Sequence, residues 1–155
     1  MSASTTRLCV GLAAMAIVGC GGASVQQEMN EDAPLEVQLR GNRITFNHRI
    51  QFGHDSEELL PASFPILDRV AELVGEHIEI IRMQVQGHSS TDGETAHNED
   101  LSTRRAAAIA DYLRAQGLTI EVTSQGYGET YPLCREDTPE CHERNRRVEF
   151  FVDER

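Results

Sequence analysis

Residues 87–105, GHSSTDGETAHNEDLSTRR, form a polar loop between a predicted strand and a predicted helix, and the rest of the chain can be arranged around them. The apolar alternation of the strand stops at Gly87, and the helix is expected to begin near Asn98. Hydroxyls and backbone N–H groups gather at such a helix start, where the helix dipole favours anions. The stretch therefore fits a site for an anionic group, and it equally fits an ordinary turn in which Asn98 caps the helix.

The chain before this loop predicts a hairpin followed by a helix. Residues 35–39 alternate between apolar and polar side chains, residues 40–43 have the composition of a turn, and residues 44–46 resume the alternation. An extension of the second strand to Phe52 is left open. Apolar side chains then recur over residues 64–74 at the spacing of an amphipathic helix.

Residues 78–87 predict a strand that is buried on one face only. Ile81, Met83 and Val85 are expected to point inward, and polar side chains alternate with them. Such alternation is typical of a sheet that is covered on one side.

The chain after the loop supplies a second helix and further strands. The helix is expected over residues 98–116, with Gly117 as its C-terminal cap. Residues 120–127 and 147–152 predict strands, and the residues between them predict a long loop. The expected fold class is α+β, a two-layer βαβαββ sandwich with two main helices on one face of a mixed three- to four-stranded sheet.

The charge of the chain argues against two classes of partner. Its 155 residues include 25 Asp and Glu against 14 basic residues, all of them arginine, for a net charge of −11. This length suits one domain with a core. Nucleic acids and anionic lipid surfaces require a broad basic field, which this chain lacks, so we expect no nucleic-acid partner.

The N-terminus has the features of an export signal and a lipid attachment site. An apolar run over residues 8–18 is shorter than the roughly 20 residues of a membrane span and fits the core of a signal peptide. The run leads into Ile-Val-Gly-Cys at residues 17–20, which resembles a bacterial lipobox. We expect a signal peptide over residues 1–19, then a lipidated Cys20 at the start of a flexible tether over residues 20–34. A soluble secretory signal with an incidental Cys20 is the alternative.

Three motifs occur in order along the remaining chain. The first joins GHSSTDG to N-x-x-L-S-x-x-R-A at residues 98–106, the second is GYGE at residues 126–129 followed by Pro132, and the third is NRRVEF at residues 145–150. Together they resemble the OmpA-like C-terminal domain, which also occurs in peptidoglycan-associated lipoproteins, over about residues 44–153. The resemblance implies a non-catalytic β/α sandwich that binds the diaminopimelate of the peptidoglycan stem peptide.

The resemblance also implies a set of ligand-binding residues. Diaminopimelate carries carboxylates beside ammonium groups, so a binder needs a guanidinium for the carboxylate and a carboxylate for the ammonium. Arg105 stands at the family's ligand-binding arginine, although a surface arginine in a charged helix has the same pattern. Arg146 either faces the same pocket or forms a cross-strand salt bridge. The implied peptidoglycan-binding residues are Arg105, Asn98, Ser90, Asp92, Ser89, Leu101 and Arg146.

The loop departs from the family pattern at the position that binds the ammonium group. The pattern is usually GHTD-x-x-G, and here Ser89 replaces the threonine and Ser90 replaces the aspartate. A hydroxyl brings no charge, and losing a charge-assisted hydrogen bond forfeits about 1.5–3 kcal/mol of binding free energy. Asp92 either takes over the ammonium group or serves only the turn before Gly93, and both interpretations stay open.

The cysteines and histidines carry the remaining candidate chemistry. Cys134 and Cys141 are expected to form a disulfide, because an exported chain meets an oxidising compartment. A metal site of these cysteines with His142 is a disfavoured alternative, since no fourth ligand is evident. His88 is expected to pack and to form hydrogen bonds at the strand end. The sequence holds no catalytic set, nucleotide-binding loop or zinc signature, so we expect no enzyme activity, no cofactor and no metal.

These features predict an outer-membrane lipoprotein whose OmpA-like domain, residues 35–155, faces the periplasm and binds peptidoglycan. Gly21 follows Cys20 in place of the aspartate that retains lipoproteins in the inner membrane of enteric bacteria, which favours the outer membrane. Other envelope proteins are further candidate partners. The alternative is a structural or interaction component of an envelope complex, with weak or no peptidoglycan binding because Ser90 replaces the usual aspartate.

Overall fold

A hairpin opens the described part of the chain, which comprises residues 33–155 of the computed structural model. Strand β1 (Val37–Arg40) pairs antiparallel with β2 (Arg43–Phe46), as predicted. The second strand does not extend to Phe52, which forms only an isolated bridge with Leu59. The predicted signal peptide, the lipidation site at Cys20 and the tether up to residue 32 lie outside the described residues.

Five strands form one mixed sheet in the order β1-β2-β5-β3-β4. Strand β3 (Ile80–Gly87) pairs parallel with β4 (Glu121–Gly126) and antiparallel with β5 (Val148–Glu154). The sheet exceeds the predicted three to four strands because β2 also pairs with β5, which joins the whole hairpin to it.

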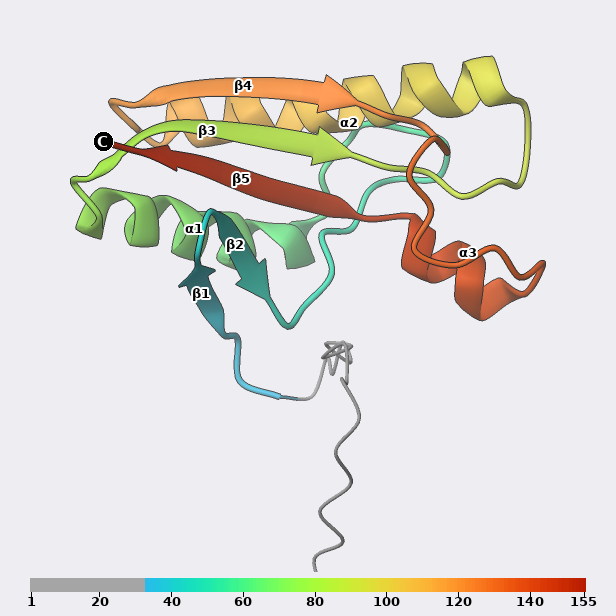
Figure 1. Cartoon of the computed structure of the whole chain (residues 1–155), viewed down its shortest axis with the longest axis horizontal. Coiled ribbons are helices and arrows are strands. Elements are labelled where there is room, and N and C mark those ends of the chain that lie inside the picture. Colours follow the sequence, from blue (N-terminus) through green and yellow to red (C-terminus); the bar gives the residue numbers. More distant parts are fainter. Residues whose placement is uncertain (1–32) are drawn as a thin grey trace, which may run out of the picture.

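Helices α1 (Phe64–Glu76) and α2 (Thr95–Ala115) form the second layer (Figure 1). A short 3₁₀ helix, η1 (Pro61–Ser63), precedes α1. The predicted two-layer α+β sandwich is confirmed, and no helix within residues 33–155 is long and apolar enough to cross a membrane. Buried side chains of both layers share one core, which includes Ile44, Leu67, Val70, Met83, Val85, Ile109, Leu113, Phe150 and Val152.

The inward alternation of β3 breaks at its first residues. The pairing with β5 shifts register between Ile80 and Arg82, so Ile80 is 2% exposed whereas Ile81 is 47% exposed. The prediction that Ile81 points inward is therefore wrong. An irregularity of this kind changes the direction of the side chains that precede it. The alternation of apolar and polar residues in the sequence does not reveal it.

A third helix, α3 (Pro139–Asn145), lies where the sequence predicted a loop (Figure 1). The Thr138 hydroxyl caps it by accepting a hydrogen bond from the Cys141 amide at 3.2 Å. Proline is favourable in a first turn, where its missing N–H is not needed. A helix of seven residues is too short to show an apolar period, so the sequence pattern could not reveal it.

Two glycines let α2 lie directly on the ends of β3 and β4. A Cβ on Gly126 would lie 2.6 Å from the Thr103 Cα atom, and one on Gly87 would lie 3.1 Å from the Ser102 carbonyl carbon. The helix backbone therefore approaches the sheet more closely than any side chain would allow. This contact fixes the position of the helix that carries Arg105.

Candidate ligand-binding pocket

A cavity of about 710 Å³ opens between α2 and the loops around it. Residues 49–55, 87–93, 97–105 and 143–148 contribute to its lining, and its volume is typical of small-molecule sites. The fold brings together side chains that are far apart in the sequence. The lining includes all seven residues that the resemblance implies: Arg105, Asn98, Ser90, Asp92, Ser89, Leu101 and Arg146.

Arg105 is a half-buried cation in this cavity. Its Nε donates to the Ser56 carbonyl at 2.9 Å, its Nη2 donates to the Gly53 carbonyl at 3.4 Å, and its guanidinium carbon lies 4.9 Å from the centre of the Phe52 ring. Within residues 33–155 it forms no ion pair. Burial lowers the pKa of Arg105, an effect that the nearby Asp55 opposes, and an arginine in this setting remains charged. Arg105 can therefore accept an anionic ligand group.

Ser90, Asp92 and Arg146 form one cluster on the loop side of the cavity. The Ser90 hydroxyl donates to the Asp92 carboxylate and accepts a hydrogen bond from Arg146 Nη1 at 3.0 Å. Arg146 Nη1 also lies 3.2 Å from Asp92 Oδ2. Ser90 is 2% exposed, whereas the Asp92 side chain is 54% exposed. The carboxylate of Asp92 thus reaches the Ser90 side chain, which stands where the resemblance implies an aspartate, and Arg146 faces the pocket.

Asn98 holds the loop and does not cap the helix. Helix α2 begins at Thr95, so Asn98 lies inside its first turn and the capping hypothesis is wrong. The Nδ2 group of Asn98 donates to the Ser90 carbonyl at 3.1 Å and to the Asp92 carbonyl at 3.2 Å. It also lies 3.2 Å from Glu129 Oε2. The buried amide therefore fixes the backbone that carries Ser90 and Asp92.

Ser89 and Leu101 line the cavity without ionic contacts. The Ser89 amide donates to the Gly128 carbonyl at 2.8 Å, and the buried Ser89 hydroxyl has no hydrogen-bond partner within residues 33–155. Leu101 is 8% exposed and contributes an apolar surface. A hydroxyl in this position can bond to a polar group of a ligand.

Two residues that the sequence did not single out extend the charged cluster. Glu143 forms ion pairs with Arg146 and with Arg49, and the Arg49 Nη2 group donates to the Glu143 carbonyl at 3.0 Å. The hydrogen bond from Arg146, supported by Arg49, lowers the pKa of Glu143. Arg49 belongs to no motif, and the role of Glu143 depends on α3, so neither residue carried a sequence signal.

His88 packs beneath an aromatic ring at the end of β3. The rings of His88 and Tyr127 are stacked with centroids 5.6 Å apart, and His88 is 7% exposed. The predicted packing role is confirmed. The predicted hydrogen bonds of the ring are not, because neither ring nitrogen has a partner within residues 33–155. Burial, supported by Arg147, lowers the pKa of His88 to about 4.

Because His88 is buried, we expect the folded protein to lose stability in mild acid. Its pKa falls from an ordinary 6.5 to about 4 on folding, so the folded state favours the neutral ring. The stabilising contribution is complete above pH 6.5 and is lost as the pH falls towards 4, by up to about 3 kcal/mol at ~1.4 kcal/mol per pKa unit. Urea unfolding at pH 7 and pH 4 measures the loss. His88→Phe keeps a ring against Tyr127 and should reduce the pH dependence; an unchanged dependence would contradict the assignment.

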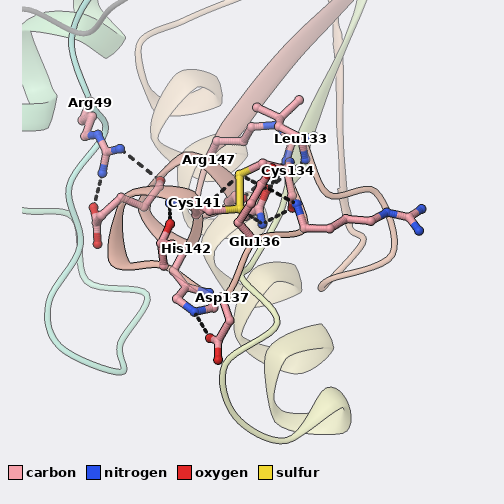
Figure 2. The surroundings of a disulfide bond; sticks show 12 residues. Arg49, Leu133, Cys134, Glu136, Asp137, Cys141, His142 and Arg147 are labelled. Atoms are coloured by element: carbon pink, nitrogen blue, oxygen red, sulfur yellow. Dashed lines mark hydrogen bonds and ion pairs between the residues drawn. A yellow bond between two sulfur atoms is a disulfide. The ribbon is translucent and has the colours of Figure 1, made fainter.

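The predicted disulfide between Cys134 and Cys141 is present, with Cα atoms 5.7 Å apart (Figure 2). It ties the first turn of α3 to the segment that follows β4. Buried Asn145 strengthens this connection, because it accepts from the Leu133 amide at 2.8 Å and donates to the Cys134 carbonyl at 3.0 Å. Since α3 leads into Arg146, the disulfide holds one wall of the cavity.

The alternative metal site is not formed, because the two cysteine sulfurs are bonded to each other. His142 interacts with Asp137 instead, with 3.0 Å between Nε2 and Oδ1 (Figure 2).

Removal of the disulfide is expected to lower the free energy of unfolding by about 2–3 kcal/mol, because the unfolded chain regains the freedom of a short loop. Urea unfolding of the wild type and of the double variant Cys134→Ser/Cys141→Ser measures the change. A reducing agent should lower the stability of the wild type to that of the variant and leave the variant unchanged. Equal stability of the oxidised wild type and the variant would contradict the expectation.

A family model matches most of the part of the chain that forms the pocket. The model described as the OmpA family matches residues 51–146, which include the Gly87–Arg105 stretch. The chain belongs to the OmpA family. The residues matched to the OmpA family include Ser90, Asp92, Asn98 and Arg105 of the pocket.

Two relatives of the OmpA-family chain cover much of its length. The peptidoglycan-binding protein ArfA of Mycobacterium tuberculosis is 36% identical over 105 residues, which cover 67% of this chain and 32% of ArfA. The outer membrane protein A of Bordetella avium is 33% identical over 141 residues, which cover 90% of this chain and 70% of that protein. The chain therefore spans about a third of the length of ArfA.

A solved structure shares the OmpA-family fold of this chain. The cell wall anchor of the T6SS from Pseudomonas aeruginosa is 27% identical, with a TM-score of 0.65, over 78% of this chain and 88% of that chain.

Proposed function

We propose that this OmpA-family chain binds the diaminopimelate stem peptide of peptidoglycan through the pocket around Arg105 and catalyses no reaction on it. The observation that carries the proposal is Arg105, a half-buried cation in a cavity that pairs with no acid within residues 33–155. A ligand carboxylate would give this guanidinium a charge-assisted partner. The similarity to the peptidoglycan-binding protein ArfA and to the cell wall anchor supports the same class of ligand.

The other lining residues have distinct parts in this proposal. Asn98 holds the loop in place, and Leu101 provides an apolar surface for the carbon chain of the ligand. Ser89, Ser90 and Asp92 offer oxygen atoms to an ammonium group. The alternative, an interaction component with weak wall binding, is favoured by one observation: the Asp92 carboxylate is already paired with Arg146.

Sedimentation with purified diaminopimelate-type sacculi tests the proposal. The mature protein should sediment with the sacculi, and free diaminopimelate should release it. A wild type that stays in solution while Ser90→Asp sediments would contradict the proposal and support the interaction component. Release of muropeptides during the incubation would contradict the non-catalytic role.

We further propose that a lipid on Cys20 holds the domain, residues 35–155, at the outer membrane, where it faces the periplasm and links the membrane to the wall. The signal peptide over residues 1–19 is removed in this account. A flexible tether of the length of residues 20–34 would keep the pocket near the membrane. The similarity to the outer membrane protein A of Bordetella avium supports the compartment.

Cys20→Ala should move the protein from the membrane fraction to the soluble fraction, because several acyl chains are needed for stable anchoring and the variant has none. Cys9→Ala is the matched control and should leave the fractionation unchanged. Membrane association of Cys20→Ala equal to that of the wild type would contradict the lipid anchor.

A further inference from the structure

The two sides of the pocket differ in how their charges are satisfied. Arg105 has backbone carbonyls and a ring as neighbours and no acid in an ion pair within residues 33–155. The loop side instead carries a complete ion pair, because Arg146 Nη1 lies 3.2 Å from one Asp92 oxygen and 3.4 Å from the other. A ligand therefore meets an unpaired cation on one side and a preformed pair of opposite charges on the other.

The Ser90 hydroxyl connects this pair to the residue at which the resemblance implies an aspartate. It donates to Asp92 and accepts from Arg146 at 3.0 Å, and Ser90 is 2% exposed. The amide of Asn98 holds the carbonyls of Ser90 and Asp92, so the loop backbone is fixed under the pair. The Asp92 side chain is 54% exposed and accessible to a ligand.

Arg146 can leave Asp92 without losing every acidic partner. Its Nη2 group pairs with Glu143, which in turn pairs with Arg49. The ion pairs thus form a row of alternating charges that ends at the more exposed of its two carboxylates; the row is Arg49, Glu143, Arg146 and Asp92. Of these four side chains, Asp92 can exchange its partner at the lowest cost, because it is the carboxylate at the end of this row of ion pairs.

We propose that the Asp92–Arg146 ion pair is exchanged for the free amino-acid centre of the ligand, with the ligand ammonium bound by Asp92 and the adjacent ligand carboxylate bound by Arg146. This inference rests on the proposed function and adds a rule of specificity to it. An ammonium and a carboxylate on one carbon replace both halves of the broken pair. Arg105 stays available for the second carboxylate of diaminopimelate.

The exchange disfavours ligands that carry an amine alone. A lysine side chain would draw Asp92 away from Arg146 and offer no carboxylate in return, so one charge-assisted contact would be lost. Loss of such a contact corresponds to about tenfold or more in affinity. A pocket with a single unpaired carboxylate would lack this discrimination, since an amine could bind it without breaking an ion pair.

Calorimetric titration with two tripeptides tests the exchange. The probes are L-Ala-D-Glu-meso-diaminopimelate and L-Ala-D-Glu-L-Lys, which differ only in the distal carboxylate. The wild type should prefer the first by about tenfold or more. Arg146→Gln should reduce this preference to about threefold or less, because Asp92 is then free for any amine. Asp92→Asn should weaken binding of the diaminopimelate tripeptide by about tenfold, and Ser90→Asp added to Asp92→Asn should restore it.

Two matched variants control for the loss of charge. Arg69→Gln removes an arginine that also pairs with two acids, Glu72 and Glu76, and Asp111→Asn removes an acid that pairs with Arg114. Both lie outside the pocket lining and should keep the wild-type preference. If the wild type binds the diaminopimelate tripeptide through Arg105 while Arg146→Gln and Asp92→Asn behave like these controls, the exchange alone is overturned. If the wild type binds neither tripeptide, the proposed function and the exchange are both overturned.

Discussion

Arg105→Ala is expected to lower the affinity of the mature protein for diaminopimelate-type sacculi by at least about tenfold, because it removes the charge-assisted contact to a ligand carboxylate. The fold should be weakened but not lost. Alanine is the best helix former, whereas the variant loses the hydrogen bonds of Arg105 to two backbone carbonyls and its contact with the face of Phe52. The variant should therefore unfold at a lower urea concentration than the wild type, remain folded in the absence of urea, and fail to sediment.

Arg104→Ala is the matched control for this experiment. Arg104 precedes Arg105 on α2, pairs with Asp100 and Glu57, and does not line the cavity. Its loss changes the net charge by the same amount, so general attraction to an anionic wall falls equally in both variants. Sedimentation curves that coincide for Arg104→Ala and Arg105→Ala would contradict a specific role of Arg105.

Gly126→Ala is expected to destabilise the fold by about 3 kcal/mol or more, because overpacking against a backbone forces the two elements apart. The added Cβ would lie 2.6 Å from the Thr103 Cα atom, which no rotamer change can relieve. Movement of α2 away from β4 would also displace Arg105 relative to the loop of Ser90, so peptidoglycan binding should fall together with stability.

Gly75→Ala provides the comparison for Gly126→Ala. Gly75 lies in α1, and a Cβ there would meet nothing within 4 Å. Alanine in a helix is more favourable than glycine by roughly 0.5–1 kcal/mol, so this variant should be as stable as the wild type or slightly more stable. Urea unfolding measures the stability of both variants, and equal stabilities would contradict the close packing of α2 on β4.

The sheet and both main helices could be predicted because their side chains alternate or recur at regular spacing. The α1 helix and the hairpin of β1 and β2 lie where the periodicity placed them. The exceptions have local causes. The irregularity between Ile80 and Arg82 turns the Ile81 side chain outward. Helix α3 is held by a threonine cap and a disulfide rather than by an apolar face.

The residues of the candidate site could be predicted from motifs, whereas their mutual contacts could not. The sequence indicated Ser90, Asp92 and Arg146 as separate candidates. The contacts between these side chains depend on the turn that brings Asp92 back to Ser90 and on α3, which places Glu143 and Arg146 beside the loop. Ion pairs between residues 54 positions apart leave no periodic trace in one sequence.

Arg105 is the central contact to the ligand in the proposed function, and one spectrum tests this role most directly. The Nε–Hε signals of the arginines, recorded by NMR, can be followed while L-Ala-D-Glu-meso-diaminopimelate is added, with Arg105→Ala and Arg104→Ala used to assign the two signals. We predict a saturable shift of the Arg105 signal and an unchanged Arg104 signal. An Arg105 signal that does not move at saturating tripeptide would contradict this role.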